Sequence, residues 1–255
     1  MILAVDIGNT NAVIGAFEGE ERLFLSRICT DKSKMPDDYA VIIKNVVELY
    51  NYKIADIKGA IVSSVVPPVS SNLVSAINKL CPEINVLLVG PGIKTGLNIK
   101  IDNPAQTGAD LVCVSVAAIK KYPLPSIVID MGTATSITAL DKNGNFLGGS
   151  IIPGVRISLD ALTNRTAQLP QISLGDNAEI IGKNTVDAMR SGVLLGQASM
   201  LDGMIKKYKK VLGDNTTVIA TGGIAGRIVS HCEEEIIYDE NLLLDGLRFL
   251  YEKNQ

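Results

Sequence analysis

The chain has 255 residues, of which 47% are hydrophobic and 20% are charged, and its formal net charge is −3. The apolar content excludes an intrinsically disordered chain and the low charge excludes a coiled coil, so we expect a globular protein with one large domain or two compact lobes. The slight excess of acid removes the broad basic surface on which nucleic-acid binding depends, so DNA and RNA are not expected partners.

Short β-branched runs alternate with longer stretches of helical periodicity, a pattern that is typical of an α/β fold. The first helical stretch shows this periodicity clearly, because Tyr39, Ile43 and Val46 fall on one face. In chain order, the expected elements are strands 2–6 and 11–17, helix 36–50, strand 60–62, helix 69–80, strand 85–89, helix 109–121, strands 127–130 and 135–140, helix 186–211, strand 218–221 and helix 241–251.

The cysteine and histidine content argues against a metal or disulfide framework. His231 is the only histidine, so no zinc cluster is expected, and widely spaced thiols suit a reducing cytoplasm. The segment Met1–Asp6 lacks the basic start of a signal peptide, and no run reaches the roughly 18 apolar residues of a membrane span. We therefore expect a cytoplasmic protein without membrane association. The cysteines, none of them in a C-x-x-C pair, are Cys29, Cys81, Cys113 and Cys232.

An internal repeat is the most informative feature of the sequence. Residues 3–17 match residues 127–140, and each copy reads as a strand, an Asp-x-Gly turn, a second strand and a hairpin turn. The copies start about half a chain apart. This arrangement predicts two similar lobes facing each other across a cleft, with an N-terminal lobe at 1–115 and a C-terminal lobe at 116–255.

The two Asp-x-Gly turns have the composition of phosphate-binding turns. Glycine permits close backbone approach, and successive backbone N–H groups form a nest that binds anions. Asp6 or Asp130 is also able to hold a hydrated cation against the same phosphate. For either residue alone, a carboxylate that merely closes its own turn is the alternative, but a symmetric pair favours two sites on one polyphosphate.

Other nucleotide and hydrolase motifs are weak or missing. The glycine pair Gly222 and Gly223 follows the expected strand 218–221 and suits a nucleoside lying flat against the backbone. The sequence has no G-x-x-x-x-G-K-[ST] loop, no G-x-G-x-x-G after a strand and no G-x-S-x-G nucleophile elbow. The two repeated turns and the glycine pair therefore carry the nucleotide hypothesis.

Together these motifs resemble the type III pantothenate kinases of the actin, sugar-kinase and Hsp70 superfamily, whose lobes are ribonuclease H-like. The resemblance covers nearly the whole chain, and the order of its blocks makes it specific. It implies ATP-dependent phosphorylation of pantothenate to 4'-phosphopantothenate, the first step of coenzyme A biosynthesis, by a homodimer that uses Mg2+ and K+ or NH4+. The blocks are Asp6–Thr10, Asn103-Pro104, Gly108–Asp110, Asp130–Thr135, Gly148-Gly149, Ile152–Gly154, Thr166-Ala167, Leu169-Pro170, Gly182–Thr185, Ala188-Met189, Ser191-Gly192 and Gly196.

The resemblance also implies a role for each matched residue. Asp110 is expected to be the general base that accepts the proton of the pantothenate hydroxyl, and Asp130 the ligand of the monovalent cation. Gly222 and Gly223 are expected beside the nucleoside. The ATP phosphates and Mg2+ are assigned to Asp6, Gly8, Asn9, Thr10, Gly132, Thr133, Ala134 and Thr135, and the acceptor site to Gly108, Ala109, Asp110, Thr185 and Arg165.

Departures from the family pattern lie mainly on the acceptor side. Leu111 stands where the family often has arginine, and Ile101-Asp102 stands where it has tyrosine. A third departure is Ala12-Val13, where some members have lysine. The lost guanidinium predicts compensation by Arg165 or Asn164, reaching the acceptor from a partner subunit, or by Thr185.

Position at a helix start predicts a low pKa for Asp110, because the macrodipole favours a carboxylate there. A capping or first-turn aspartate is the structural alternative. Phosphoryl transfer tolerates a weak base, since its loose transition state needs the hydroxyl oriented more than deprotonated.

Two rival functions and three surface assignments complete the sequence-based expectations. One rival is a kinase for another small hydroxylated metabolite, and the other is a non-catalytic accessory regulator of the same fold. A filament-forming actin relative is disfavoured by the short chain. The apolar stripe of helix 186–211 is expected to suit a subunit interface, and His231 and residues 233–235 are expected at the solvated surface.

Overall fold

The computed structural model describes residues 1–175 and 177–255, which form two compact units. The first comprises 1–96, 103–117 and 242–255, and the second comprises 97–102 and 118–241. The division expected from the sequence at 115/116 falls close to the 117/118 boundary. The segments 97–102 and 242–255 each join the unit opposite to the expected one, because β6 pairs with β9 and α7 packs on β1 and β4.

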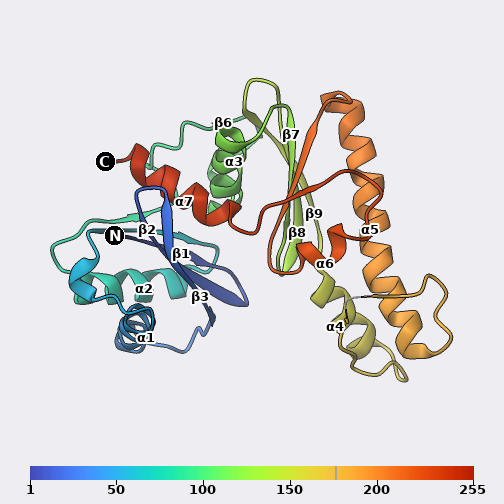
Figure 1. The fold of residues 1–255 in the computed structure, drawn as a ribbon, viewed down its shortest axis with the longest axis horizontal. Coiled ribbons are helices and arrows are strands. Elements are labelled where there is room, and N and C mark those ends of the chain that lie inside the picture. The colour runs from blue at the N-terminus through green and yellow to red at the C-terminus, as the bar shows by residue number, and fades with distance from the viewer. Residues whose placement is uncertain (176) are drawn as a thin grey trace. The chain divides into compact units, whose positions relative to one another are not determined.

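Each unit is built on one sheet with helices packed against it, which confirms the α/β class (Figure 1). The elements of the first unit are β1 (Ile2–Ile7), β2 (Asn11–Glu18), β3 (Glu21–Cys29), α1 (Pro36–Leu49), η1 (Ile54–Asp56), β4 (Gly59–Ser64), α2 (Pro67–Leu80), β5 (Val86–Leu88), η2 (Pro104–Gln106), the N-terminal part of α3 (Ala109–Lys121) and α7 (Leu242–Lys253). Those of the second are β6 (Asn98–Ile99), β7 (Ser126–Met131), β8 (Ala134–Leu140), β9 (Asn145–Pro153), α4 (Val155–Arg165), α5 (Thr185–Leu212), β10 (Thr217–Thr221), α6 (Ala225–Val229) and β11 (Ile237–Tyr238).

The repeat seen in the sequence is confirmed by the topology of the two sheets. The first sheet has the order β3-β2-β1-β4-β5, and the second contains the equivalent order β9-β8-β7-β10-β11 with β6 added beside β9. In both sheets the Asp-x-Gly strand pairs antiparallel with the strand that follows it and parallel with a later one. The carboxyl end of that strand is therefore a central position in each sheet, where binding sites of α/β folds gather.

Local sequence explains where the main helices begin and end. Pro36 starts α1, and Asp38 accepts a hydrogen bond from the backbone N–H of Met35. Asn184 caps α5 by accepting the backbone N–H of Asp187, and Gly213, at a φ of 104°, ends it.

The long helix α5 corrects one expectation. Its apolar stripe is buried in the core of the second unit against β7, β8, β10, α4 and α6, so the stripe is not free to form a subunit interface. A stripe at helical spacing says only that one face is covered, and here the chain's own sheet covers it. The buried side chains of the stripe are Met189, Val193, Leu194, Ala198, Leu201 and Ile205.

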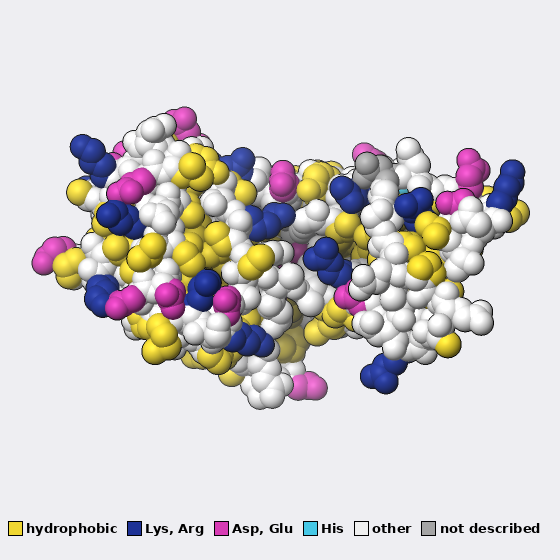
Figure 2. All heavy atoms as spheres, turned by 90° about the horizontal axis from the view of Figure 1, so that it is seen from below, with side chains coloured by type: hydrophobic (Ala, Val, Ile, Leu, Met, Phe, Trp, Pro, Cys, Tyr) yellow, Lys and Arg dark blue, Asp and Glu magenta, His cyan; other side chains and the backbone are white. Residues whose placement is uncertain are grey.

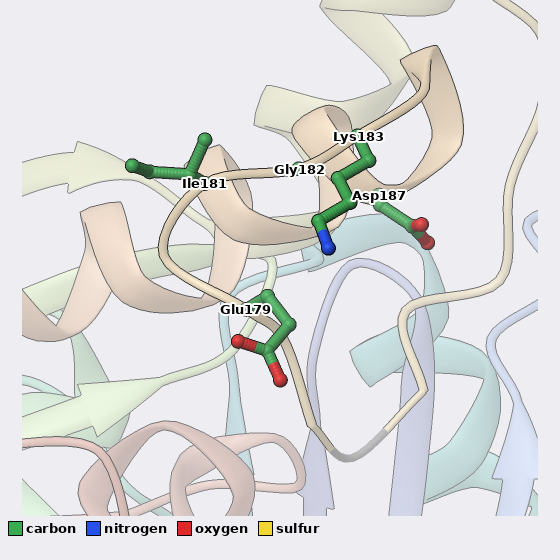
Figure 3. A pocket seen from close by; sticks show the side chains of 5 residues that line it. All are labelled: Glu179, Ile181, Gly182, Lys183 and Asp187. Atoms are coloured by element: carbon green, nitrogen blue, oxygen red, sulfur yellow. The ribbon is translucent and has the colours of Figure 1, made fainter.

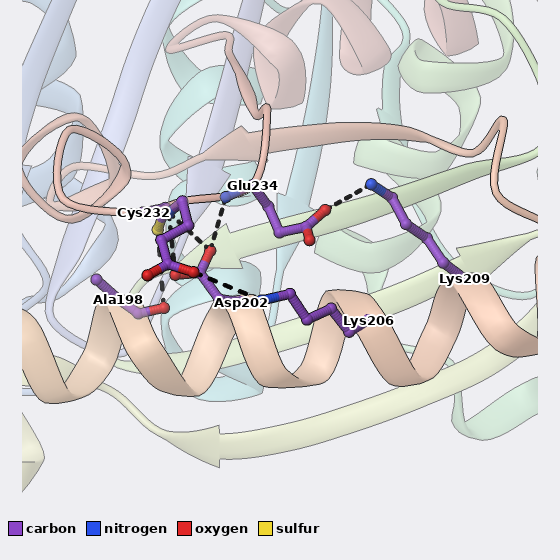
Figure 4. Close-up of polar contacts among 7 residues, drawn as sticks. Ala198, Asp202, Lys206, Lys209, Cys232 and Glu234 are labelled. Carbon is purple, nitrogen blue, oxygen red and sulfur yellow. Dashed lines mark hydrogen bonds and ion pairs between the residues drawn. The ribbon is translucent and has the colours of Figure 1, made fainter.

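A buried carboxylate on α5 fixes the segment that follows α6 (Figure 4). Asp202, 6% exposed, accepts the backbone N–H groups of Glu233 and Glu234 at 3.0–3.1 Å. The Glu234 side chain is only 17% exposed and pairs with Lys209 at 2.6 Å, so it departs from the solvated surface expected for 233–235. Burial, followed by the charge of Asp202, raises the pKa of the Cys232 thiol to about 12. His231 is half-buried.

A second carboxylate ties the end of α3 to the segment before α7. Asp239 accepts hydrogen bonds from Nζ of Lys121 at 2.6 Å and from the hydroxyl of Tyr122 at 2.7 Å. Burial raises the pKa of Asp239, but these two bonds and the Asn241 backbone N–H outweigh it and hold that pKa below its usual value. The ionised form of Asp239 therefore stabilises this part of the second unit.

The surface shows mixed charge. On the face drawn in Figure 2, Lys and Arg side chains are interspersed with Asp and Glu. Among the described residues, no helix combines the length and apolar character needed to cross a bilayer.

Candidate active site

The first Asp-x-Gly turn joins β1 to β2 and is closed by its own backbone. The N–H of Gly8 donates to the carbonyl of Asn11 at 3.0 Å, and the hydroxyl of Thr30, the residue directly after β3, donates to the Gly8 carbonyl at 2.7 Å. Asp6 is half-buried on β1, while the side chains of Asn9 and Thr10 are exposed at the tip. The turn therefore presents a carboxylate, an amide and a hydroxyl around one glycine.

The second turn, between β7 and β8, is tighter by one residue. The N–H of Gly132 donates to the carbonyl of Ala134 at 3.0 Å, and Met131 pairs directly with Thr135. Asp130 is half-buried, as Asp6 is in the first turn, and Thr135 is fully buried. Gly132 and Ala134 are exposed and Thr133 is half-buried, so these three predicted phosphate residues lie at the rim of the turn, whereas Thr135 lies inside it.

Two glycines that are distant in sequence pack on the backbone of the second turn. A Cβ on Gly222 would lie 2.5 Å from the Met131 carbonyl oxygen, and one on Gly154 would lie 2.2 Å from that of Thr133. Gly222 also has a φ of 102°, which favours glycine. The structure thus brings the predicted nucleoside residues Gly222 and Gly223 to the predicted phosphate turn. Gly154, the residue before α4, also packs on this turn, although no site role was predicted for it from the sequence.

Asp110 is the second residue of α3 and is half-buried. Its Oδ1 accepts the backbone N–H of Leu111 at 2.8 Å. Burial raises the pKa of Asp110 above its usual value, and the backbone N–H bond to Leu111 lowers it by less. The expectation of a low pKa from the helix macrodipole is therefore wrong, because loss of solvent around the carboxylate outweighs the favourable field of the helix end.

Gly108 makes the room that the Asp110 carboxylate occupies. A Cβ at position 108 would stand 2.3 Å from Oδ1 of Asp110, closer than real Cβ atoms approach a neighbour. The position of the Asp110 carboxylate therefore depends on the absence of a side chain at Gly108. Leu111 is half-buried next to them and presents no charge.

The remaining predicted acceptor residues belong to the second unit. Thr185 is the exposed first residue of α5, and Arg165 is the exposed last residue of α4. Gly182 turns tightly before α5, where a Cβ would lie 2.2 Å from the backbone nitrogen of Ala188. A cavity of about 270 Å³ opens at this helix start (Figure 3). It is lined by Glu179, Ile181, Gly182, Lys183 and Asp187.

The structure places Ile101, one of the departures from the family pattern, in the second unit. Ile101 packs against β9, where a Cβ on Gly148 would lie 3.3 Å from its Cγ2. Ile101 is thus part of the second unit's packing beside β6.

Among the described residues, no three His, Cys, Asp or Glu side chains gather into a dedicated metal cage.

Comparison with known proteins agrees with these motifs. A family profile described as type III pantothenate kinase matches residues 2–207. The chain is 42% identical to the type III pantothenate kinase of an Exiguobacterium strain over the full length of both, and 44% identical to that of Bacillus cytotoxicus over all of this chain and 97% of the relative.

Solved structures support the fold alone. A Campylobacter jejuni protein described as a candidate Baf family transcriptional activator superposes with a TM-score of 0.62 at 19% identity, covering 99% of this chain and 98% of that one. The activator of 2-hydroxyisocaproyl-CoA dehydratase from Clostridium difficile, solved with bound ADPNP, gives a TM-score of 0.53 at 16% identity, covering 99% and 94%. Both likenesses span essentially the whole chain.

Proposed function

The chain belongs to the type III pantothenate kinase family, and we propose that the residues described above divide among themselves the work of that family's reaction, the ATP-dependent phosphorylation of pantothenate in coenzyme A biosynthesis. The family assignment disfavours both rivals, a kinase for another metabolite and a non-catalytic regulator. The observation that carries the division of roles is the Gly108–Asp110 geometry, in which a glycine leaves space for one half-buried carboxylate.

Asp110 acts as the general base. The hydroxyl oxygen of pantothenate attacks the γ-phosphorus of ATP, the bond from that phosphorus to the β,γ-bridging oxygen breaks, and the hydroxyl proton passes to the Asp110 carboxylate. The raised pKa of Asp110 makes it a better proton acceptor than an ordinary aspartate. Its bond to the Leu111 N–H orients the carboxylate, which matters most for a loose transition state.

Asp6 and the first turn bind the phosphates and Mg2+. A half-buried carboxylate beside a glycine turn fits this metal, which is usually held by one or two carboxylates plus substrate phosphates and water. Bound Mg2+ would neutralise charge on the phosphate oxygens. The backbone of Gly8 and the side chains of Asn9 and Thr10 supply the neighbouring donors.

The second turn binds phosphate as well, and Asp130 holds a monovalent cation, K+ or NH4+. The packing of Gly222 on Met131 supports a nucleoside position at Gly222 and Gly223, adjacent to this turn. Asp130→Ala is expected to change the dependence of the rate on K+, whereas Asp6→Ala is expected to change only the use of Mg·ATP. An unaltered K+ titration in Asp130→Ala would remove the cation role.

The enzyme works as a homodimer in which Arg165 and Thr185 serve the acceptor. Because the stripe of α5 is buried, the interface is assigned instead to exposed apolar side chains of β9 and α4, namely Ile151, Ile157 and Leu162, which are 78%, 42% and 39% exposed. Arg165 ends the same helix α4. The free thiols of all four cysteines, each within the described residues, agree with a cytoplasmic setting.

Asp110→Asn tests the central assignment. It is expected to lower kcat by roughly 10²-fold or more, the scale of a positioned base, while ATP binding measured by calorimetry stays near the wild-type value. Asp214→Asn, an exposed aspartate in the turn after α5, is the matched control. Wild-type turnover by Asp110→Asn would show that the base lies elsewhere.

A further inference from the structure

Each Asp-x-Gly strand has a hydroxyl residue as its aligned neighbour on the adjacent parallel strand. Ser63 of β4 is the register partner of Asp6, and Thr221 of β10 is the register partner of Asp130. Side chains alternate along a strand, and aligned partners of a parallel pair project from the same face of the sheet. The internal repeat therefore includes a hydroxyl beside each aspartate, contributed by a strand far away in the sequence.

Ser63 is one of several buried hydroxyl residues without a hydrogen bond of full geometry among the described residues, and it is the one aligned with Asp6. The residue is fully buried, and its Oγ makes no hydrogen bond to a nitrogen or oxygen atom among the described residues; its polar contact is with the Cys113 thiol, a weak hydrogen-bonding group. Burying an unsatisfied hydroxyl costs on the order of 1–3 kcal/mol, so a folded protein usually keeps one only where a ligand-bound state or an ordered water uses it. The thiol contact alone leaves most of the hydrogen-bonding capacity of this hydroxyl unused.

The Cys113 thiol interacts with Ser63 and also senses the charges of Asp6 and Asp110. This thiol sits one helical turn after Asp110 on α3 and is fully buried. Burial and then the charge of Asp6 raise the pKa of the Cys113 thiol well above its usual value; a hydrogen bond with Ser63 lowers that pKa by less, and the charge of Asp110 raises it further. The neutral thiol is thus an uncharged group close to Ser63, Asp6 and Asp110.

The packing of helix α7 restricts the position of Cys113 and of the strands β1 and β4. Helix α7 packs on β1 and β4, and a Cβ on its Gly246 would lie 2.0 Å from the carbonyl oxygen of Cys113. Backbone-to-backbone packing of this kind leaves α3 little freedom to move away from the sheet. Ser63 itself is fixed beside Asp6 by the parallel pairing of β4 with β1.

We propose that Ser63 is a positioning residue for Asp6, and that in the enzyme carrying Mg·ATP its hydroxyl donates a hydrogen bond to the Asp6 carboxylate. The bond orients the carboxylate so that its other oxygen faces the water shell of Mg2+. This inference rests on the proposed function, which assigns Mg·ATP to Asp6. Thr221 occupies the corresponding place beside Asp130, which makes threonine the conservative replacement at position 63.

The test compares Ser63→Ala and Ser63→Thr with wild type. In Ser63→Ala, the Mg2+ concentration for half-maximal rate is expected to rise about tenfold, because a hydrogen bond to a charged acceptor is lost. Calorimetry should show the same loss without turnover: the gain in ATP affinity on adding Mg2+ shrinks, while affinity for ATP in EDTA is unchanged. Ser63→Thr should restore both values, and KM for pantothenate should stay constant.

Stability and a matched control separate positioning from packing. Urea unfolding of Ser63→Ala should show little loss of stability, because the buried hydroxyl has only the weak thiol contact to lose among the described residues. Ser115→Ala is the control, since Ser115 is also fully buried on α3 with an unpartnered Oγ but lies on another face of that helix from Asp110. It should leave the Mg2+ dependence unchanged.

The outcomes are distinguishable from failure of the proposed function. Wild-type Mg2+ dependence in Ser63→Ala, by rate and by calorimetry, overturns the inference. If Asp6→Ala changes the Mg2+ dependence in the same experiment, only the role of Ser63 is lost. If Asp6→Ala also leaves it unchanged, the assignment of Mg·ATP to Asp6 falls together with the inference.

Discussion

Replacing Gly108 by alanine perturbs the proposed base by a single methyl group. The added Cβ would stand 2.3 Å from Oδ1 of Asp110, whereas ordinary van der Waals contact begins at 3.4 Å. The carboxylate must therefore retreat by about 1 Å, and it gives up its hydrogen bond from the Leu111 N–H. Misplacing a reacting group by about 1 Å costs roughly 10²-fold in rate.

Steady-state kinetics with ATP and pantothenate varied in turn measure the effect. We expect kcat to fall about 10- to 100-fold, which corresponds to about 1.4–2.7 kcal/mol in the barrier, while KM for ATP stays unchanged. Thermal unfolding should shift little, because the atom that moves is the end of a flexible side chain. Gly90→Ala is the control: Gly90 lies in the same unit, its φ is not positive, and a Cβ there has no neighbour within 4 Å.

The kinetic pattern decides whether the geometric reasoning holds. Turnover of Gly108→Ala within about twofold of wild type refutes the argument that Gly108 sets the position of Asp110. Equal losses in the Gly108 and Gly90 variants would also refute it, since the effect would then belong to any added methyl group in the unit. A rise in KM for ATP alone would place Gly108 in the nucleotide site instead.

Three further predictions follow from the carboxylates of the structure. Because burial raises the pKa of Asp110, kcat/KM for pantothenate should fall as pH drops through a pKa above the usual 3.8, and a pH profile with its acid limb at or below 3.8 would contradict this. Asp239 has a lowered pKa, so its stabilisation is present above about pH 4 and is lost as pH falls through the folded-state value. Asp239→Asn, which breaks the pair with Lys121, should cost about 1–3 kcal/mol at pH 7 in urea unfolding and much less at pH 2. Asp202→Ala removes the acceptor of the Glu234 backbone N–H and should lower the free energy of unfolding by about 1–3 kcal/mol without altering KM for ATP. An unchanged free energy of unfolding would show that the hydrogen bonds of Asp202 to the segment after α6 do not stabilise the protein.

Much of the fold was predictable because its signals are local. Helix 109–121 has the expected bounds, and the helices expected at 36–50, 186–211 and 241–251 differ from α1, α5 and α7 by only a residue or two at either end. Strong apolar periodicity, a capping residue and a terminal glycine all act within one turn of the helix they define. Helix α4 and the short α6 were not predicted, since neither carries a clear apolar stripe in the sequence.

The candidate site was predictable only in part. The Asp-x-Gly motifs and Gly108–Asp110 are continuous segments, so they can be recognised in the sequence. Ser63 carried no sequence signal, because its importance depends on the register of β1 with β4. The packing of Gly222 on Met131 likewise joins residues of two strands that are separated by most of the second unit.

By itself, the sequence determined the class of fold, the duplicated turn and the family, since each depends on residue types at short fixed spacing. Tertiary structure alone decided the proton affinity of Asp110 and which surface covers the apolar stripe of α5. A carboxylate at a helix start is favoured by the dipole, but its pKa follows the solvent that surrounding segments remove. An apolar stripe must be covered, but only the packing of β7, β8 and β10 shows that the chain covers its own. Burial and register arise from contacts between segments distant in sequence, and no local pattern contains them.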